Sequence, residues 1–285
     1  MSSEIGVRAI HLNDSRQMKL TGVILDWAGT IVDHGSCAPV AALCEAFASA
    51  GVPITTAEAR LSMGLAKRAH IASILNLPEV RDRWVQVRGK APESSDGDEV
   101  YAGFVPKQIE VLRNHSELIA GVAQAAARMR SRGWKIGTST GYNRVMLNYL
   151  LDRAREQGFV PDHSVCPDDV PSGRPAPFMC YLNAVQMQIF PMWTLVKIGD
   201  TAVDIEEGLN AGMWTIGITR TGNEVGLTPA EWTSMNDAER AGKLAAAERV
   251  LRNAGAHYIA ESVAECDQIF DAIEDRLRSG GCPST

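Results

Sequence analysis

Short apolar runs alternate with longer amphipathic stretches over most of this chain. The apolar runs predict strands at residues 22–27, 135–139, 163–166, 195–199 and 214–218. The stretches beside them predict helices near residues 121–132, 143–157, 177–188, 201–211, 237–254 and 261–278. Strands that alternate with helices in this way usually form a mostly parallel sheet, so the predicted fold class is α/β.

A block without strand-like runs interrupts this alternation between residues 35 and 114. Its pattern predicts helices at residues 38–50, 56–63, around Lys67, at 79–88 and at 98–114. The polar stretch 90–100 predicts an exposed loop inside the block. The predicted organisation is an N-terminal extension at 1–19, a core domain at 20–34 and 115–285, and an inserted helical domain at 35–114.

Composition narrows the class of protein. A chain of 285 residues with 45% hydrophobic content is long enough for one large domain and an insertion. No apolar run is long enough for a membrane span, residues 1–19 lack the apolar core of a signal peptide, and the net charge of −6 argues against a nucleic-acid partner. The six cysteines show no Cys-Xaa-Xaa-Cys spacing, which indicates reduced thiols and a cytoplasmic protein.

Polar side chains follow three of the predicted strands at the point where each strand ends. Asp26 opens the stretch DWAGTIVD after the apolar run at 22–25, and Asp200 ends the third of these strands, four residues before Asp204. Thr140 and Gly141 follow another strand and precede a helix, where a hydroxyl and a backbone N–H favour an anion. Open α/β sheets bind ligands at this edge, so these residues predict a site.

The stretches at 26–33, 137–142, 171–177 and 195–204, in this order, resemble the four motifs of the haloacid dehalogenase superfamily. The resemblance implies a Rossmannoid core with a mostly parallel sheet and an inserted helical cap domain. It makes Asp26 the nucleophile that forms an aspartyl-phosphate. Arg174 matches the superfamily's basic residue, which neutralises phosphoryl oxygens and suits that task as a bidentate donor.

The same resemblance implies a magnesium ion. Asp26, Asp200 and the backbone carbonyl of Ala28 are its expected ligands, and Asp204 supports them about one helical turn later. Hard oxygen ligands completed by water molecules are what Mg²⁺ prefers.

Ala28 departs from the superfamily pattern, because phosphatases of this superfamily usually carry a second aspartate there to protonate a departing oxygen. A methyl group cannot donate a proton, so either the enzyme is inactive or its leaving group needs no such proton. A lysine in the inserted block bears on this choice. If the chain is helical near Lys67, Met63 and His70 share one face with it, although Gly64 is a possible break.

The stretch 63–70, MGLAKRAH, taken with DWAGT at 26–30, resembles the phosphonoacetaldehyde hydrolases, or phosphonatases. The resemblance runs from about residue 20 to near the C-terminus and includes the stretches at 140–142, 167–175 and 199–201. It implies hydrolysis of the carbon–phosphorus bond of phosphonoacetaldehyde, a small-molecule phosphonate, during 2-aminoethylphosphonate degradation. It also implies a homodimer joined through the cap.

This resemblance gives Lys67 the role of forming a Schiff base with the substrate aldehyde, so that the leaving group becomes a neutral enamine. His70 is then the expected proton shuttle, with a packing histidine as the alternative. Met63, Tyr142 and Cys37 are expected near the substrate, and Cys37 is alternatively a small core residue. The group that activates water for aspartyl-phosphate breakdown stays open.

Two other functions stay open as well. One is a phosphate-ester hydrolase or mutase of the same superfamily, which Ala28 disfavours and which leaves Lys67 unexplained. The other is a catalytically silent phosphate-binding protein, which has no need of a nucleophile and an imine-forming amine together.

Overall fold

A six-stranded parallel sheet forms the centre of the molecule in a computed structural model, which describes residues 19–283. The strand order is β3-β2-β1-β4-β5-β6. The strands are β1 (Gly22–Leu25), β2 (Lys135–Ser139), β3 (His163–Val165), β4 (Leu195–Gly199), β5 (Trp214–Ile218) and β6 (Tyr258–Ala260). Five of them confirm the sequence prediction, whereas the short strand β6 was not expected.

The register of the sheet decides what meets at its carboxyl edge. Leu25 at the end of β1 pairs with Thr138 of β2 on one side and with Ile198 of β4 on the other. Because the three strands are parallel and in step, the residues that follow them, Asp26, Thr140 and Asp200, emerge at the same edge.

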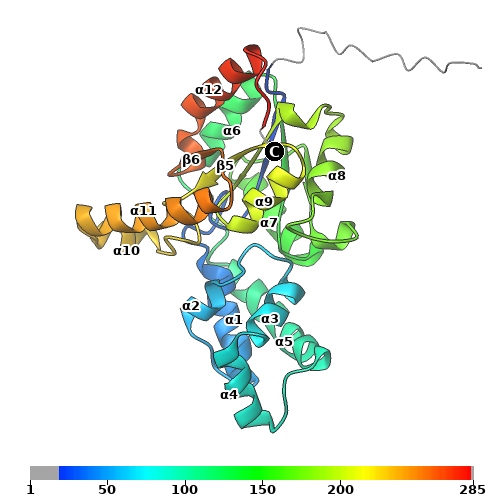
Figure 1. Ribbon diagram of the computed structural model, residues 1–285, viewed down its shortest axis with the longest axis vertical. Coiled ribbons are helices and arrows are strands. Elements are labelled where there is room, and N and C mark those ends of the chain that lie inside the picture. The colour runs from blue at the N-terminus through cyan, green and yellow to red at the C-terminus, as the bar shows by residue number, and fades with distance from the viewer. Residues whose placement is uncertain (1–18, 284–285) are drawn as a thin grey trace, which may run out of the picture.

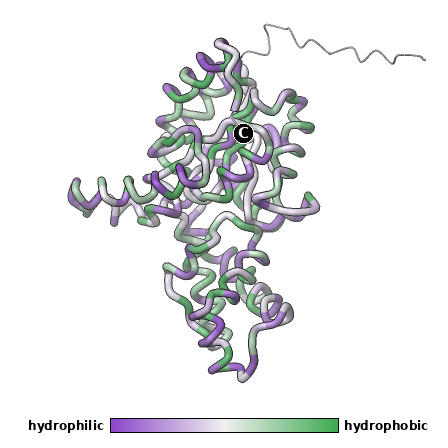
Figure 2. Tube along the Cα trace, in the orientation of Figure 1, coloured by the Kyte–Doolittle hydropathy of each residue, from purple (hydrophilic) through white to green (hydrophobic). Residues whose placement is uncertain are grey.

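Helices cover both faces of the sheet. The first face carries α6 (Val122–Ser131), α7 (Arg144–Glu156) and α12 (Asp267–Arg278), and the second carries α8 (Phe178–Met187), α9 (Ala202–Asn210) and α11 (Asp237–Asn253). Successive side chains of β1 point to opposite faces of the sheet. Val23 and Leu25 join the larger hydrophobic core, while Ile24 packs with residues of α8 on the other face. Figure 2 shows hydrophobic and hydrophilic residues alternating along the helices.

Five helices between β1 and α6 form a separate lobe beyond the carboxyl edge of the sheet (Figure 1). They are α1 (Cys37–Ser49), α2 (Thr56–Arg60), α3 (Lys67–Leu75), α4 (Pro78–Arg88) and α5 (Ser94–Leu112). We refer to this lobe as the cap; the domain boundaries at residues 34 and 115 stay predictions. The expected extension at 1–19 falls almost wholly outside the described residues.

Two local predictions within the cap were wrong. The stretch 90–100 is mostly helical, because Glu93 and Asp96 form a reciprocal capping box that starts α5 at Ser94. The helix predicted at 56–63 ends at Arg60, and the chain then turns through Gly64. The polar composition of 90–100 favoured a loop, but the capping box at its centre starts a helix. The apolar pattern at 56–63 favoured a longer helix, but the chain turns before Gly64.

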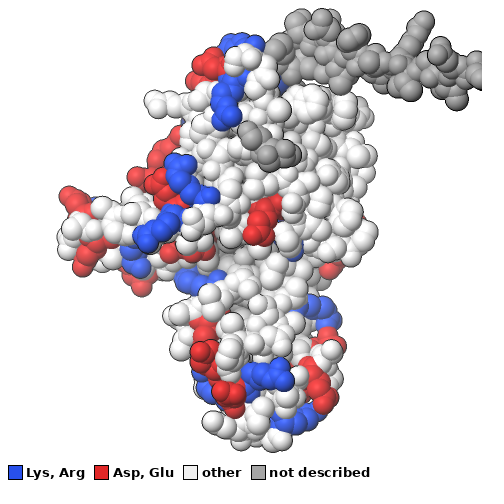
Figure 3. All heavy atoms as spheres, viewed as in Figure 1, with Lys and Arg blue, Asp and Glu red and all other residues white. Residues whose placement is uncertain are grey.

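One further element, α10 (Pro229–Ser234), was not expected and projects with α11 from the side of the core (Figure 1). Acidic and basic side chains lie side by side on the cap face that Figure 3 shows. Among residues 19–283, no helix combines the length and apolar character that a bilayer crossing requires.

Candidate active site

Asp26 stands at the centre of the site. Its backbone N–H donates to the carbonyl of Ile198 at 2.9 Å, which fixes it directly at the end of β1. Its carboxylate is buried, and Oδ1 lies 2.7 Å from Nη2 of Arg174. Burial raises the pKa of this carboxyl, whereas the charge of Arg174 lowers it.

A small cavity opens in front of Asp26, between the core and the cap. The loops that follow β1, β2 and β4, the Arg174 loop, the start of α1 and the turn before α3 form its walls. Its lining residues are Asp26, Ala28, Ser36, Pro39, Met63, Gly64, Lys67, Thr140, Gly141, Tyr142, Arg174, Asp200 and Thr201. Nine residues predicted from the sequence are therefore brought together around one cavity.

Carboxylates in this site suit a divalent cation. One oxygen each from Asp26, Asp200 and Asp204 lies within 4.8 Å of the others. Burial and then the charge of Asp26 raise the pKa of Asp200 well above its usual range, so Asp26 and Asp200 are not fully compensated by protein cations. Carboxylate oxygens whose negative charge is not balanced by nearby protein cations suit a hard cation such as Mg²⁺.

Asp204 is held differently from the other two acids. Its Oδ1 lies 2.9 Å from Nη1 of Arg174 and 2.9 Å from Nζ of Lys197, and Thr201 donates to its Oδ2 at 2.5 Å. Burial opposes ionisation, but the two cations hold the pKa of Asp204 below its usual value. These contacts agree with a supporting position for Asp204 behind Asp26 and Asp200.

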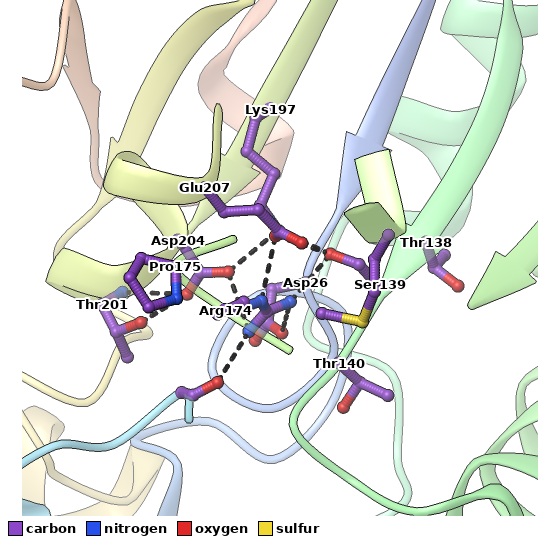
Figure 4. A network of polar contacts seen from close by, with 12 residues as sticks. Asp26, Thr138, Ser139, Thr140, Arg174, Pro175, Lys197, Thr201, Asp204 and Glu207 are labelled. Atoms are coloured by element: carbon purple, nitrogen blue, oxygen red, sulfur yellow. Dashed lines mark hydrogen bonds and ion pairs between the residues drawn. The ribbon is translucent and has the colours of Figure 1, made fainter. Parts of the chain in front are cut away.

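Arg174 joins Asp26 to a buried ionic network (Figure 4). Its Nε lies 3.0 Å from Oε2 of Glu207, and its Nη2 donates to Oγ of Ser139 at 2.9 Å. Ser139 donates in turn to Glu207 at 3.0 Å and accepts from Lys197 at 2.9 Å. The guanidinium is thereby fixed from behind while one edge faces Asp26.

Lys67 enters the cavity from the cap and is only 6% exposed. It is the first residue of α3, where the helix dipole disfavours a positive charge, and no acidic residue lies in that first turn. Burial, partly offset by the charge of Asp26, lowers the pKa of its amine to about 8. Nζ lies 3.7 Å from the sulfur of Met63 and 5.2 Å from the ring centroid of Tyr142.

The Tyr142 hydroxyl is buried with no hydrogen-bond partner among the described residues. Burial, together with the nearby carboxylates, raises its pKa well above the usual value, so it stays a neutral donor. A substrate oxygen is the kind of group that would satisfy it.

Three predicted site residues lie outside the cavity wall, namely Asp204, which is described above, His70 and Cys37. His70 packs behind Lys67 one turn along α3 and is fully buried, with neither ring nitrogen hydrogen-bonded in the described part of the chain. Burial and then the charge of Lys67 lower its pKa to about 3, so the ring is neutral. Cys37 contacts Arg60 and the carbonyl of His34 at the start of α1.

Glycines allow the cap to touch the core here. Gly64 has φ +91°, and a Cβ on it would lie 2.4 Å from Oγ1 of Thr201. A Cβ on Gly141 would lie 2.3 Å from the carbonyl oxygen of Leu65. Met63 therefore reaches Lys67 through a tight turn and not along a shared helix face.

Sequence reasoning missed Ser139, Lys197 and Glu207. Each sits inside a regular element, where it contributes to a strand or helix pattern without a motif of its own. The available signal was a lysine within the apolar strand at 195–199, which is unusual for a buried central strand.

The family model for haloacid dehalogenase-like hydrolases matches residues 20–212 of this chain. The chain belongs to this family. It is 46% identical to a phosphonoacetaldehyde hydrolase of Syntrophobacter fumaroxidans over 92% of this chain and 94% of the relative, and 43% identical to one of Nitratidesulfovibrio vulgaris over 92% and 93%. A phosphonoacetaldehyde hydrolase-like protein from Oleispira antarctica has a similar structure, with a TM-score of 0.91 and 38% identity over 93% of this chain and 96% of that one.

The contact between cap and core yields a first prediction for this hydrolase. Gly64→Ala places a methyl group against Thr201 and pushes the turn off the core, which displaces Lys67. We expect a loss of turnover of about 100-fold, because small misplacements of reacting groups have effects of that size. Steady-state phosphate release measures it.

Gly89→Ala is the matched control, since Gly89 also has a positive φ of 74° in the cap but has nothing within 4 Å of an added Cβ. Both variants should lose about 1 kcal/mol of stability from the left-handed backbone, and Gly89→Ala should keep full activity. Equal activity losses in the two variants would contradict a role for the cap–core contact.

Proposed function

We propose that the protein hydrolyses the carbon–phosphorus bond of phosphonoacetaldehyde to acetaldehyde and phosphate. The observation that carries the proposal is the pairing of Lys67, a buried amine with a pKa of about 8, with Asp26 across one cavity in which Ala28 supplies no acid. The names of the similar proteins support the same substrate. A phosphate-ester hydrolase would leave Lys67 without a task.

The first step is condensation of Lys67 with the aldehyde. The neutral amine attacks the carbonyl carbon, and loss of water gives a protonated imine. A pKa of about 8 leaves a useful fraction of free amine near neutral pH. His70 stays the predicted proton carrier for this step; its ring is neutral, and a pKa of about 3 makes it a weak base.

In the second step the Asp26 carboxylate attacks phosphorus. The phosphorus–carbon bond breaks, and its electron pair moves into the imine to give an enamine, so no alkoxide leaves and no acid is needed at position 28. Arg174, Thr140 and Gly141 line the cavity, and the guanidinium, the hydroxyl and the Gly141 N–H would bind the phosphoryl oxygens.

The products leave by two hydrolyses. The enamine takes a proton on carbon, and water then releases acetaldehyde from Lys67. A second water hydrolyses the aspartyl-phosphate to free phosphate. Mg²⁺ held by Asp26, Asp200 and the Ala28 carbonyl would supply charge stabilisation for the phosphoryl group.

We extend the proposal to the setting of the enzyme. It works in the cytoplasm on 2-aminoethylphosphonate-derived aldehyde, as a homodimer joined through the cap. Neither a nucleic acid nor a membrane takes part.

Asp200→Asn tests the metal site, because it keeps the size of the side chain and removes its charge. Removing an indirect partner of a metal often costs about 10- to 100-fold in affinity, and we expect at least that loss of Mg²⁺ affinity here. Both the Mg²⁺ concentration for half-maximal activity and the Mg²⁺-induced rise in Tm report it. Glu224→Gln is the control acid outside the cavity, and an unchanged Mg²⁺ response in Asp200→Asn would remove Asp200 from the ligand set.

Lys67→Arg tests the imine. A guanidinium keeps the charge but stays protonated and cannot condense with an aldehyde, so phosphonate cleavage should be lost. Borohydride with phosphonoacetaldehyde should leave a stable adduct on Lys67 of the parent, found by peptide mass analysis, and none at this position in the variant.

Asp26→Asn separates the two half-reactions. It retains Lys67, so borohydride should still trap the adduct, while phosphate release disappears with the nucleophile. An adduct on another lysine, or an active Lys67→Arg enzyme, would overturn the imine mechanism and favour a phosphate ester as substrate.

Imine trapping should depend on pH through Lys67. Only the free amine reacts, so the trapping rate should rise with pH and level off above an apparent pKa near 8. The negative charge of Asp26 raises this pKa, so Asp26→Asn should shift the curve to lower pH. A midpoint near the ordinary lysine value of about 10.4 in the parent would show that the amine is not buried during reaction.

A further inference from the structure

Lys197 is a lysine in the middle of the central sheet. Its side chain is 0% exposed, although its neighbours Val196 and Ile198 belong to the apolar core. Strand alternation turns Lys197 toward the opposite face, where α9 covers it. Burying an unpaired ammonium group costs free energy, so the groups that pair with Lys197 indicate its role.

The partners of Lys197 are three side chains of the buried ionic network around Arg174. Nζ lies 2.9 Å from Oδ1 of Asp204 and 3.1 Å from Oε2 of Glu207, and it donates to Oγ of Ser139 at 2.9 Å. All three groups also contact Arg174 (Figure 4). Lys197 and Arg174 therefore share the same two carboxylates.

The fold makes room for this lysine. A Cβ on Gly208 of α9 would lie 2.7 Å from Cβ of Lys197, and a Cβ on Gly199 would lie 2.3 Å from Cγ of Asp204. Both glycines have ordinary backbone angles, so close approach is what requires them. Helix α9 is thus seated directly on the lysine stem and on its carboxylate partner.

The sharing of carboxylates has an electrostatic consequence. Without Lys197, Asp204 and Glu207 would face Arg174 alone, and together they would outweigh its single charge. The guanidinium would then be less able to attract Asp26 or a phosphoryl oxygen, and Asp204 would compete with Asp26 and Asp200 for a cation.

We infer that Lys197 is a positioning residue: by neutralising Asp204 and Glu207 it keeps the edge of Arg174 that faces Asp26 available to phosphoryl oxygens and keeps Asp204 away from the metal. The inference rests on the aspartyl-phosphate half of the proposed function and not on the imine. The inferred role of Lys197 applies to any substrate whose phosphoryl group reaches Asp26.

Lys197→Met tests this role, since methionine fills a similar volume without charge. Binding of inorganic phosphate in the presence of Mg²⁺, measured by titration calorimetry, should weaken by about tenfold or more, which is about 1.4 kcal/mol. In turnover, kcat should fall while the borohydride adduct at Lys67 still forms. Lys107→Met, which removes a lysine paired with Glu45 on the cap, should leave all these values unchanged.

The double variant Lys197→Met/Glu207→Gln is a second test of the inference. It removes one cation and one carboxylate, so the charge balance around Arg174 returns. We expect phosphate affinity within about threefold of the parent, under 1 kcal/mol. If Lys197→Met alone does not fold, the double variant still tests the inference. It should fold, because removing one carboxylate restores the charge balance.

Parent-like phosphate affinity in a folded Lys197→Met protein would overturn the inference. A double variant that fails to fold, or that binds phosphate no better than the single variant, would overturn it too. Phosphate binding needs no phosphonate chemistry. A parent that binds phosphate as expected but does not cleave phosphonoacetaldehyde would therefore reject the proposed substrate and leave the role of Lys197 standing.

Discussion

A balance of buried charge governs this molecule. Four carboxylates from the carboxyl edge of the sheet and α9 lie close to two buried cations, so these carboxylates outnumber the cations by two. Those carboxylates are Asp26, Asp200, Asp204 and Glu207, and the cations are Arg174 and Lys197. Because buried charge is tolerated only when it is paired, the surplus of carboxylate at Asp26 and Asp200 suits a divalent cation.

The sequence predicted the residues that emerge from strand ends, and the reason is geometric. Parallel strands in register must deliver the residues that follow them to one edge, so Asp26, Thr140 and Asp200 converge once the strands are recognised. Lys197 and Glu207 were not predicted, because their partners come from other elements and no local pattern records such pairings. Their role becomes visible only when α9 is packed against β4.

The cap illustrates the same limit at short range. Helical spacing placed His70 correctly one turn from Lys67, but the chain breaks at Gly64, and the Met63 contact arises from the turn. The reason for the break lies in the core, where Thr201 leaves no space for a side chain at Gly64. A local sequence pattern contains no information about that distant contact.

Placing the reactive amine on the cap has a further consequence. Burial is the largest cause of the low pKa of Lys67, and that burial exists because the cap turn rests on the core. A cap that swings away would return Lys67 to water and raise its pKa toward the ordinary value, so the amine would be protonated. In the proposed mechanism, closure over the substrate and activation of Lys67 are then the same event, while Asp26 and its neighbouring cations stay fixed on the sheet.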